Sequence, residues 1–404
     1  MFEFLKKYWD IDEKILSLAE DVDKEIQKEF LRIDEICSCN NAKVLNSFIT
    51  NCITSQHLLG TTGYGYNDIG RSKIDNVFAD IFCTEDALVR HNFVSGTHTI
   101  STALFGISKP GTHIVSVTGK PYDTLQHIMK DFQDYNIFFD YVPLNSDLKF
   151  ELGKFEKVNI VYIQRSKGYE FRNALSVAGV NSIIQNVKEI NRNIVTVVDN
   201  CYGEFVEKDD INADLIIGSL IKNPGGGIAR TGGYICGRAD LIEKCAKRLT
   251  LNRDVGCTLD VNREILLGVY NSPNVVANAL KIGTFTSRFY KKIGFETTDI
   301  GGDIVVAIKL GSKELLENFC LGIQKFSPVD SHLTPIPWEM PGYDCDVIMA
   351  AGAFTNGSSI ELSADAPLRE PFIVYLQGGT NYTNGIIAVL NTTNMLLQKG
   401  LIKL

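Results

Sequence analysis

The stretch of sequence that decides the fold lies near the middle of the chain and reads Ile216-Ile217-Gly218-Ser219-Leu220-Ile221-Lys222-Asn223-Pro224-Gly225-Gly226-Gly227. Its apolar first half predicts a buried strand, and its glycines predict a tight turn directly after the lysine. In parallel sheets, ligands bind at the carboxyl ends of the strands, which is where Lys222 falls. Burial beside Leu220 and Ile221 would lower the pKa of this lysine and leave a neutral amine as nucleophile or base. The alternative is a lysine that is simply solvated in a glycine-rich loop.

Two segments upstream add an acid and an anion site. Val195–Asp199 predicts a second strand that ends in a carboxylate, although an aspartate at a strand end also commonly caps a turn. Phe93–Thr97 precedes a predicted helix, and small residues at a helix N-terminus expose backbone N–H groups that bind anions. A phosphate site, then an acid, then a lysine is the order of anchors that a pyridoxal-phosphate enzyme needs. The acid faces the pyridinium nitrogen, and the lysine forms the Schiff base.

The pattern around these segments alternates between short β-branched runs and longer helical stretches. This predicts an α/β fold with a mostly parallel sheet that is covered on both faces. The predicted strands are His113–Thr118, Asn159–Ile163, Ile194–Asp199, Asp214–Leu220 and Gly233–Cys236. The predicted helices are Thr97–Gly106, Tyr122–Phe132, Leu175–Asn191 and Leu241–Leu251. Before them, apolar residues at steps of three and four between Ile11 and Ile33 predict one amphipathic helix, and Gly60–Arg71 reads as an irregular loop.

The pattern changes after a long predicted helix at Cys257–Phe285. Beyond it we expect strands at Asp303–Leu310 and Phe372–Leu376, and helices at Lys313–Ile323 and Thr383–Gln398. These elements predict a smaller α+β domain. We therefore divide the chain into an N-terminal helical arm (1–55), a large α/β domain (56–275) and a small C-terminal α+β domain (276–404).

Composition narrows the class of protein. The chain has 404 residues, of which 45% are hydrophobic and 22% charged, as is ordinary for a soluble globular protein. A net charge of −8 without a basic cluster argues against nucleic-acid binding, and no apolar run is long enough to cross a membrane. The ten cysteines are scattered and form no CxxC pair. We therefore expect free thiols in a reducing compartment, no metal site and a cytoplasmic location.

Several stretches resemble the fold-type I pyridoxal-phosphate enzymes, specifically the cystathionine β-lyase and methionine γ-lyase group. They are most similar to its bacterial branch labelled "aluminium resistance protein". The resemblance extends from about Asn46 to the C-terminal helix and is carried by Thr62–Arg71, Val198–Glu204, Ser219–Gly227, Pro335–Trp338 and Leu362–Arg369. It implies an aspartate aminotransferase-like fold with a large and a small domain, and pyridoxal 5′-phosphate as the cofactor.

The resemblance also implies roles for single residues. Lys222 would carry the Schiff base and act as the general base, Asp199 would keep the pyridinium nitrogen protonated, and Tyr122 would stack on the cofactor ring. The remaining cofactor-binding residues would be Tyr202 near the 3′-oxygen, and Ser95, Gly96, Thr97 and Ser219 at the phosphate.

The residues expected to bind the substrate differ from those of the better-known lyases. Their carboxylate-binding arginine lies in an Arg-Leu-Ser run, which here reads Glu361-Leu362-Ser363. Arg369 is the best replacement because its planar guanidinium can bind a carboxylate through two hydrogen bonds, and Tyr64 is the second expected substrate-binding residue. Tyr66 and Arg71 would reach the cofactor phosphate of a partner subunit. This implies a homo-oligomer, a dimer with shared active sites, with a tetramer as the expected assembly.

The expected reaction is β- or γ-elimination on a sulfur-containing amino acid, with a thiol, an oxo acid and ammonia as products. Racemases, aldolases and aminotransferases share the first bond cleavage at Cα and remain alternatives. A stress-related protein that binds pyridoxal phosphate without turnover is a further alternative.

Overall fold

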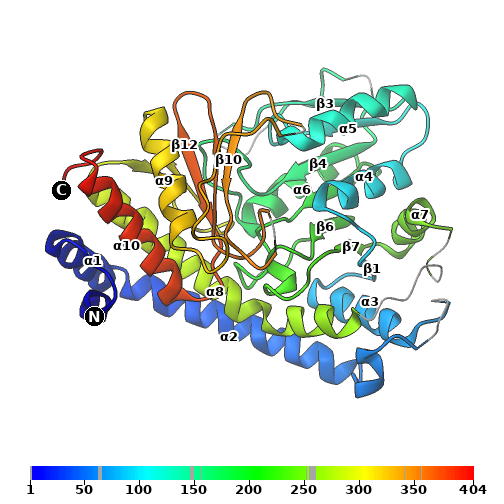
Figure 1. The fold of residues 1–404 in the computed structure, drawn as a ribbon. Helices are drawn as coiled ribbons and strands as arrows, with labels where there is room; N and C mark the ends of the chain where they lie inside the picture. Colours follow the sequence, from blue (N-terminus) through cyan, green and yellow to red (C-terminus); the bar gives the residue numbers. More distant parts are fainter. Residues whose placement is uncertain are drawn as a thin grey trace.

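The structure is a computed structural model that describes residues 2–61, 66–145, 150–155, 157–251, 253, 261–340, 342–355 and 357–404. Figure 1 shows a large α/β unit, a smaller unit that contains the C-terminus, and long helices running beneath both. No helix among the described residues is long and apolar enough to span a membrane.

The N-terminal arm consists of a short 3-10 helix, η1 (Phe2–Lys7), and two helices, α1 (Glu13–Glu25) and α2 (Gln27–Thr50). The prediction of one continuous amphipathic helix is therefore wrong at Ile26, whose ψ of 7° ends α1. The side-chain amide of Gln27 donates to the carbonyl of Asp23 at 2.8 Å, the group that its own N–H would bond in a continuous helix. Ile26 is fully buried at this break, so both helices keep their apolar faces on the core.

The described residues form a seven-stranded sheet in the large unit, in the order β1-β7-β6-β5-β4-β2-β3. Only β7 runs antiparallel to its neighbours. The strands are β1 (Asp86–Arg90), β2 (His113–Ser116), β3 (Phe138–Tyr141), β4 (Ile160–Gln164), β5 (Val195–Asp199), β6 (Leu215–Ser219) and β7 (Gly233–Gly237). The predicted mostly parallel sheet is confirmed; β1 and β3 are strands that the sequence pattern does not single out.

Helices cover both faces of this sheet, and alternate residues of each strand explain why. In β6, Leu215 and Ile217 belong to the cluster that faces one layer of helices, whereas Ile216 belongs to the cluster that faces the other layer. The first layer contains α4 (Gly96–Ile107), α5 (Asp123–Asp134) and α7 (Ala239–Leu249). The second contains α3 (Ile69–Ile81), α6 (Val177–Ile190) and α8 (Asn262–Ile293). The end of the predicted loop at Gly60–Arg71 thus belongs to α3.

The smaller unit is built on a second sheet, which in the described residues has five antiparallel strands in the order β10-β11-β12-β9-β8. Its elements are β8 (Glu296–Thr297), β9 (Val305–Lys309), α9 (Lys313–Lys325), β10 (Val347–Ala350), β11 (Ser363–Pro367), β12 (Ile373–Gln377) and α10 (Tyr382–Gln398). One face packs on α9 and α10, and the other, which carries Val305 and Tyr375, contacts Tyr169 and Tyr202 of the large unit.

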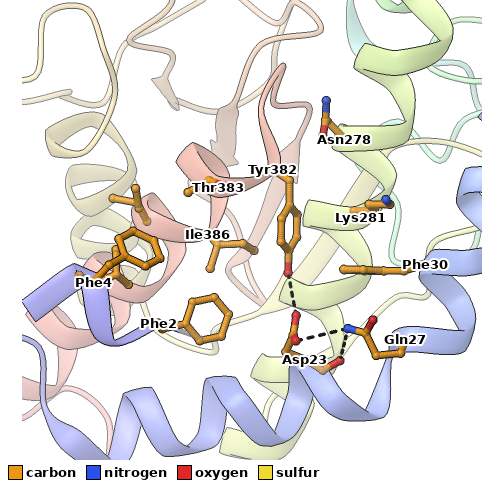
Figure 2. Close-up of a pocket in the computed structure, with 12 residues that line it drawn as sticks. Phe2, Phe4, Asp23, Gln27, Phe30, Asn278, Lys281, Tyr382, Thr383 and Ile386 are labelled. Carbon is orange, nitrogen blue, oxygen red and sulfur yellow. Dashed lines mark hydrogen bonds between the residues drawn. The ribbon is translucent and has the colours of Figure 1, made fainter.

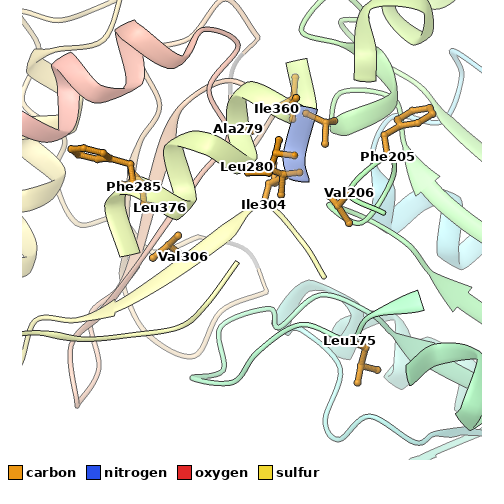
Figure 3. Packing of buried hydrophobic residues seen from close by; sticks show 14 of the residues in the cluster. Leu175, Phe205, Val206, Ala279, Leu280, Phe285, Ile304, Val306, Ile360 and Leu376 are labelled. Atoms are coloured by element: carbon orange, nitrogen blue, oxygen red, sulfur yellow. The ribbon is translucent and has the colours of Figure 1, made fainter. Parts of the chain in front are cut away.

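The two units share one hydrophobic core along α8. Figure 3 shows Ala279 and Leu280 of this helix near Ile304 of the small unit, with Val206 of the large unit next to them. The predicted domain boundary at residue 275 lies inside α8, so the backbone crosses between the units without a loop.

A buried ion pair also joins the units beside the cavity described below. The Lys167 ammonium donates to the carboxylate of Asp303 at 2.6 Å and to the carbonyl of Val305 at 2.7 Å, and the Ser166 hydroxyl donates to the other Asp303 oxygen at 2.8 Å. Lys167 and Asp303 are both fully buried. These bonds hold the start of β9 against the loop that follows β4.

Candidate active site

A cavity of about 280 Å³ lies where the carboxyl ends of β4, β5 and β6 meet the small sheet. The predicted residues Ser95, Gly96, Thr97, Tyr122, Asp199, Tyr202, Ser219 and Lys222 all line it. The small unit contributes Val305, Tyr343, Gly357, Ser358, Asp365, Tyr375 and Gln377. The site therefore lies at the strand ends, where a parallel sheet is expected to place it.

Lys222 follows β6 and begins the turn η3 (Asn223–Gly225). The glycine run is required here, because a Cβ on Gly225 would lie 1.8 Å from the carbonyl oxygen of Leu220, and Gly226 has a φ of +54°. The Lys222 ammonium donates to the hydroxyl of Tyr202 and to the carbonyl of Ser358. Burial lowers the pKa of Lys222, while nearby acidic groups that include Asp365 and Asp199 raise it.

Asp199 ends β5 and accepts two hydrogen bonds from groups beside it. The N–H of Cys201 donates to one carboxylate oxygen at 3.1 Å, and the hydroxyl of Tyr162 donates to the other at 3.0 Å. Burial raises the pKa of Asp199, and these two donors oppose that effect. A protonated ring nitrogen against this carboxylate would supply a counter-charge in a buried position.

The opposite end of the site has the features of an anion site. Ser95 is the N-cap of α4 and accepts a hydrogen bond from the His98 N–H at 3.1 Å. Ser95, Gly96 and Thr97 line the cavity, and the first N–H groups of a helix have no partner within the helix. The hydroxyl oxygen of Ser219 is buried without a hydrogen-bond partner. A Cβ on Gly96 would come within 3.4 Å of the Ser219 side chain. These features fit a phosphate group held between α4 and Ser219.

Tyr122 is the N-cap of α5, between the acid and the anion site. Its N–H donates to the side-chain oxygen of Gln164 at 3.1 Å, and burial, followed by the charge of Asp199, raises the pKa of its hydroxyl well above the usual value. Sequence reasoning missed Tyr162 and Gln164 because they lie inside a strand. Only the register of β4 against β5, which pairs Tyr162 with Val197 and Gln164 with Asp199, places them at the site.

Of the predicted substrate-binding and partner-binding residues, Arg369, Tyr66 and Arg71 do not line this cavity. Arg369 is not among the lining residues; its guanidinium bonds Asp344 at 2.9 Å and lies 3.8 Å from Asp123 at the rim. Tyr66 and Arg71 do not line the cavity of their own chain either, and Tyr66 is 46% exposed. Tyr64 lies outside the described residues.

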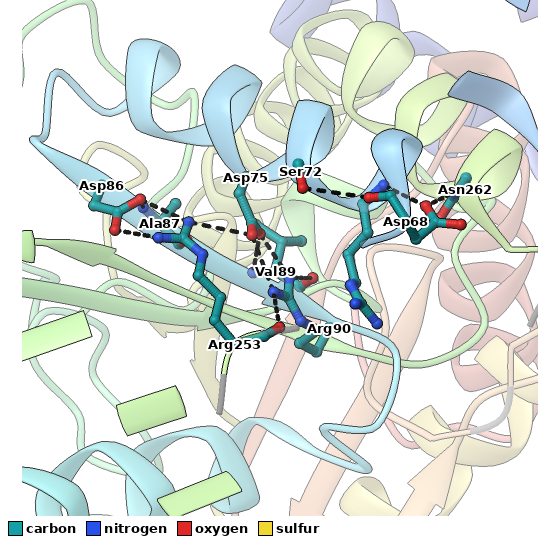
Figure 4. A network of polar contacts seen from close by, with 10 residues as sticks. Asp68, Ser72, Asp75, Asp86, Ala87, Val89, Arg90, Arg253 and Asn262 are labelled. Carbon is teal, nitrogen blue, oxygen red and sulfur yellow. Dashed lines mark hydrogen bonds and ion pairs between the residues drawn. The ribbon is translucent and has the colours of Figure 1, made fainter. Parts of the chain in front are cut away.

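Arg71 belongs to α3, which is joined to its neighbours by hydrogen bonds and ion pairs. Asp68 caps this helix by accepting from the Arg71 N–H at 2.7 Å and also bonds the side-chain amide of Asn262 (Figure 4). Further along the helix, buried Asp75 accepts from the guanidinium of Arg90 at 2.7 and 3.0 Å. Arg253 also bonds Asp75, at 3.2 Å (Figure 4). α3 is thereby tied to β1 and α8, so its first turn is presented at a defined position.

A second cavity, of about 340 Å³, lies between the N-terminal arm, α8 and α10. Of the residues that the structure describes, the two charged ones that line it already have partners: Asp23 accepts from Gln27 and Tyr382 (Figure 2), and Lys281 bonds Asp34 at 2.6 Å. Its remaining walls are mostly aromatic and aliphatic, so we place the chemistry in the first cavity.

Glu204, which follows β5 closely in the chain, is a buried acid for which the sequence suggested no role. One of its carboxylate oxygens accepts from the Tyr234 hydroxyl at 2.7 Å, and the other has no hydrogen-bond partner. Burial raises its pKa from 4.5 to about 8. The carboxyl group is therefore protonated in the folded protein at neutral pH.

We expect Glu204→Gln to stabilise the protein at pH 8. The unfolded chain releases the Glu204 proton near pH 4.5, whereas the folded chain keeps it until about pH 8, so folding of the wild type becomes less favourable across this interval. A glutamine has no proton to lose. Urea unfolding at several pH values checks this: the advantage of the variant should grow from pH 4.5 to 8, and an advantage that is the same at every pH would contradict it.

The fold and the site together define the class of protein. A large, mostly parallel sheet, a small domain and a lysine between them are the architecture of the fold-type I pyridoxal-phosphate-dependent enzymes, and the structural comparison agrees. Within this class, residues 15–397 match the methionine gamma-lyase family, and the chain belongs to that family. The predicted family and fold class are thus confirmed.

Similar proteins cover nearly the whole chain. A Clostridium acetobutylicum structure, provisionally named a cystathionine beta-lyase involved in aluminium resistance, is 40% identical with a TM-score of 0.94 and covers 98% of this chain and 100% of its own. A Clostridium novyi structure, named a carbon–sulfur lyase involved in aluminium resistance, is 42% identical with a TM-score of 0.91 and covers 98% of each chain. The uncharacterized protein YnbB of Bacillus subtilis is 41% identical over 96% of this chain and 98% of its own.

Proposed function

We propose that this protein is a pyridoxal-phosphate-dependent carbon–sulfur lyase that releases a thiol from the β or γ carbon of a sulfur-containing amino acid. The observation that carries the proposal is that Lys222, Asp199 and the start of α4 line one cavity. Membership of the methionine gamma-lyase family supports it, as does the name of the Clostridium novyi relative. Elimination consumes one water molecule and gives a thiol, an oxo acid and ammonia.

The residues of the site fit pyridoxal phosphate at each of its ends. The N–H groups at the start of α4 and the buried Ser219 hydroxyl would bind the phosphate, and Asp199 would hold a proton on the pyridine nitrogen. When bound, the cofactor would supply a ring that accepts the electrons of the bond broken at Cα. The Tyr122 side chain, between these two anchors, would lie against the ring.

Lys222 would perform the proton transfers. Its pKa is lowered by burial, which makes a neutral amine available to remove the Cα proton. The Tyr202 hydroxyl accepts a bond from the Lys222 nitrogen and a second from the side-chain amide of Gln377 at 3.0 Å, so the amine is held at a defined position. Once protonated, the same ammonium can deliver the proton to the departing sulfur.

A panel of amino acids tests the activity. The cofactor-loaded protein is offered cystathionine, methionine and cysteine, and thiol, oxo acid and ammonia are measured together. We expect the three products in equal amounts from at least one sulfur-containing substrate. An oxo acid without thiol would indicate transamination, inversion at Cα would indicate a racemase, and no product from any member of the panel would indicate a binding protein; each of these would contradict the proposal.

We also propose that two copies of the chain share each active site and that the protein works in the cytoplasm. Tyr66 and Arg71 do not line the cavity of their own chain; Arg71 lies in the first turn of α3 and Tyr66 just before this helix, and both would contact the cofactor phosphate of a partner. The nine cysteines within the described ranges are all free thiols, which supports a reducing compartment.

Mixing two inactive variants checks the shared site. We expect Arg71→Ala and Lys222→Ala each to lose activity, and mixed dimers to regain part of it. The reason is that one of the two sites in a mixed dimer carries both defects while the other carries neither. The recovered rate is measured after subunit exchange, with exchange followed independently by mass spectrometry. Exchange without recovery would mean that each chain builds its site alone.

A further inference from the structure

The small sheet contributes a carboxylate to the cavity that the proposed chemistry does not use. Asp365 lies on β11 directly beside Tyr375 of β12, so both side chains leave the same face of the sheet toward the large unit. It is 4% exposed, and it lines the same cavity as Asp199.

One oxygen of Asp365 is fully engaged and the other is not. The engaged oxygen accepts from the Ser358 hydroxyl at 2.7 Å and from the Tyr169 hydroxyl at 3.3 Å. The other oxygen is buried without a hydrogen-bond partner. A buried carboxylate oxygen without a donor is costly, so this atom calls for a ligand that donates a hydrogen bond or carries a positive charge.

Tyrosine side chains lie close to this carboxylate, since Tyr169 bonds it and Tyr375 is its neighbour on β12. The ring centre of Tyr169 lies 5.0 Å from that of Tyr375 and 5.7 Å from that of Tyr343, and all three residues line the cavity. The faces of tyrosine rings attract cations, and a group of rings beside a carboxylate is a common way to bind an ammonium or sulfonium group. The wall thus has two independent features that favour positive charge.

The charged residues that line the cavity also favour a cationic ligand. Within the described part of the chain, the lining residues include the carboxylates of Asp199, Asp365 and Asp123, and one cationic side chain, Lys222. Arg369 is directed to Asp344 and Asp123 rather than to Asp365. Asp365 itself is linked to Lys222 through a single residue, because Ser358 donates to Asp365 through its hydroxyl and accepts from Lys222 through its carbonyl. A substrate bound at Lys222 would therefore have Asp365 close to it.

We propose that Asp365, together with Tyr169, Tyr343 and Tyr375, makes the site select amino acids whose side chain ends in a positively charged group. The ammonium group would bond the unpartnered oxygen of Asp365 and lie against the tyrosine rings. This inference rests on the proposed function, because the cavity must bind an amino acid. It adds the class of side chain that is bound and the residue that recognises it.

Two unreactive amino acids of the same shape provide the test. L-Ornithine and L-norleucine differ at the end of the side chain, which is an ammonium in the first and a methyl group in the second, and neither carries a sulfur leaving group. We expect calorimetry with the cofactor-loaded wild type to show at least about tenfold tighter binding of ornithine. Equal affinity, a preference for norleucine, or no binding of either would overturn the proposal, and this comparison needs no variant.

Two variants then test which carboxylate recognises the ammonium group of ornithine. Asp365→Asn keeps the shape of the side chain and should bring the two affinities to within about twofold, with folding verified by thermal melting. Asp123→Asn removes another carboxylate of the same cavity and should leave the preference for ornithine in place. Loss of the preference in Asp123→Asn but not in Asp365→Asn would assign the recognition to Asp123 and overturn the proposal. Because binding is measured without turnover, failure of the amino-acid panel and failure of this test are distinguishable.

Discussion

Lys222→Ala should lower turnover at least about 10³-fold and remove the Schiff-base absorption band of the cofactor-loaded protein. Two functions are lost together, since Lys222 is both the amine that would form the Schiff base and the group that would move the Cα proton. Its position supports both, because it lies at the end of β6 with its nitrogen held by Tyr202 and Ser358. Absorption spectra, followed by steady-state rates of thiol release, measure the two losses separately.

Two comparison variants make this result specific. Lys222→Arg keeps the positive charge but provides no neutral amine at accessible pH, so it should be as inactive as the alanine variant. Lys120→Ala removes an exposed lysine two residues before Tyr122 and should keep wild-type activity. Borohydride reduction followed by peptide mapping should place the cofactor on Lys222. A label on any other lysine would contradict the assignment.

The large domain could be predicted from the sequence because its central strands are buried on both faces. Runs such as Val195–Asp199 and Leu215–Ser219 are apolar almost throughout, and they end at or just before the polar residues that carry chemistry. The end of such an apolar run can be recognised in a single sequence. Because Asp199 and Lys222 both lie at or just after such an end, the sequence alone predicts that they lie at one edge of the sheet.

The wall formed by the small domain could not be predicted in this way. Strand β11 reads Ser-Ala-Asp-Ala-Pro from Ser363 to Pro367, which has no alternation of large apolar and polar residues although every position is buried. The strand exists because β10 and β12 pair with it on both sides. Asp365 therefore reads as a loop residue, and its neighbours Tyr169 and Tyr375 come from other parts of the chain. Tertiary pairing, which local patterns do not report, assembles this side of the site.

Asp199→Asn should lower kcat by about 10²–10⁴-fold while the protein stays folded and still binds the cofactor, a loss of about 3–5 kcal/mol of transition-state stabilisation. The asparagine keeps the shape of the side chain and an oxygen for the Cys201 N–H, which bonds Asp199 at 3.1 Å. It carries no negative charge, so it cannot hold a proton on a buried ring nitrogen. Rates of thiol release and cofactor content are measured on the same preparation, and near-normal turnover would remove Asp199 from this role.

Tyr162→Phe distinguishes loss of charge from loss of position. The Tyr162 hydroxyl donates to Asp199 at 3.0 Å, and its removal leaves the carboxylate in place with one donor fewer. Because burial already raises the pKa of Asp199, losing this donor should raise it further and weaken the hold on the ring proton without abolishing it. We expect a loss of roughly 10- to 100-fold in kcat, smaller than that of Asp199→Asn, because one hydrogen bond to a charged group is worth about 1.5–3 kcal/mol. If Tyr162→Phe is as damaging as Asp199→Asn, the orientation of the carboxylate, rather than its charge, is what the site requires.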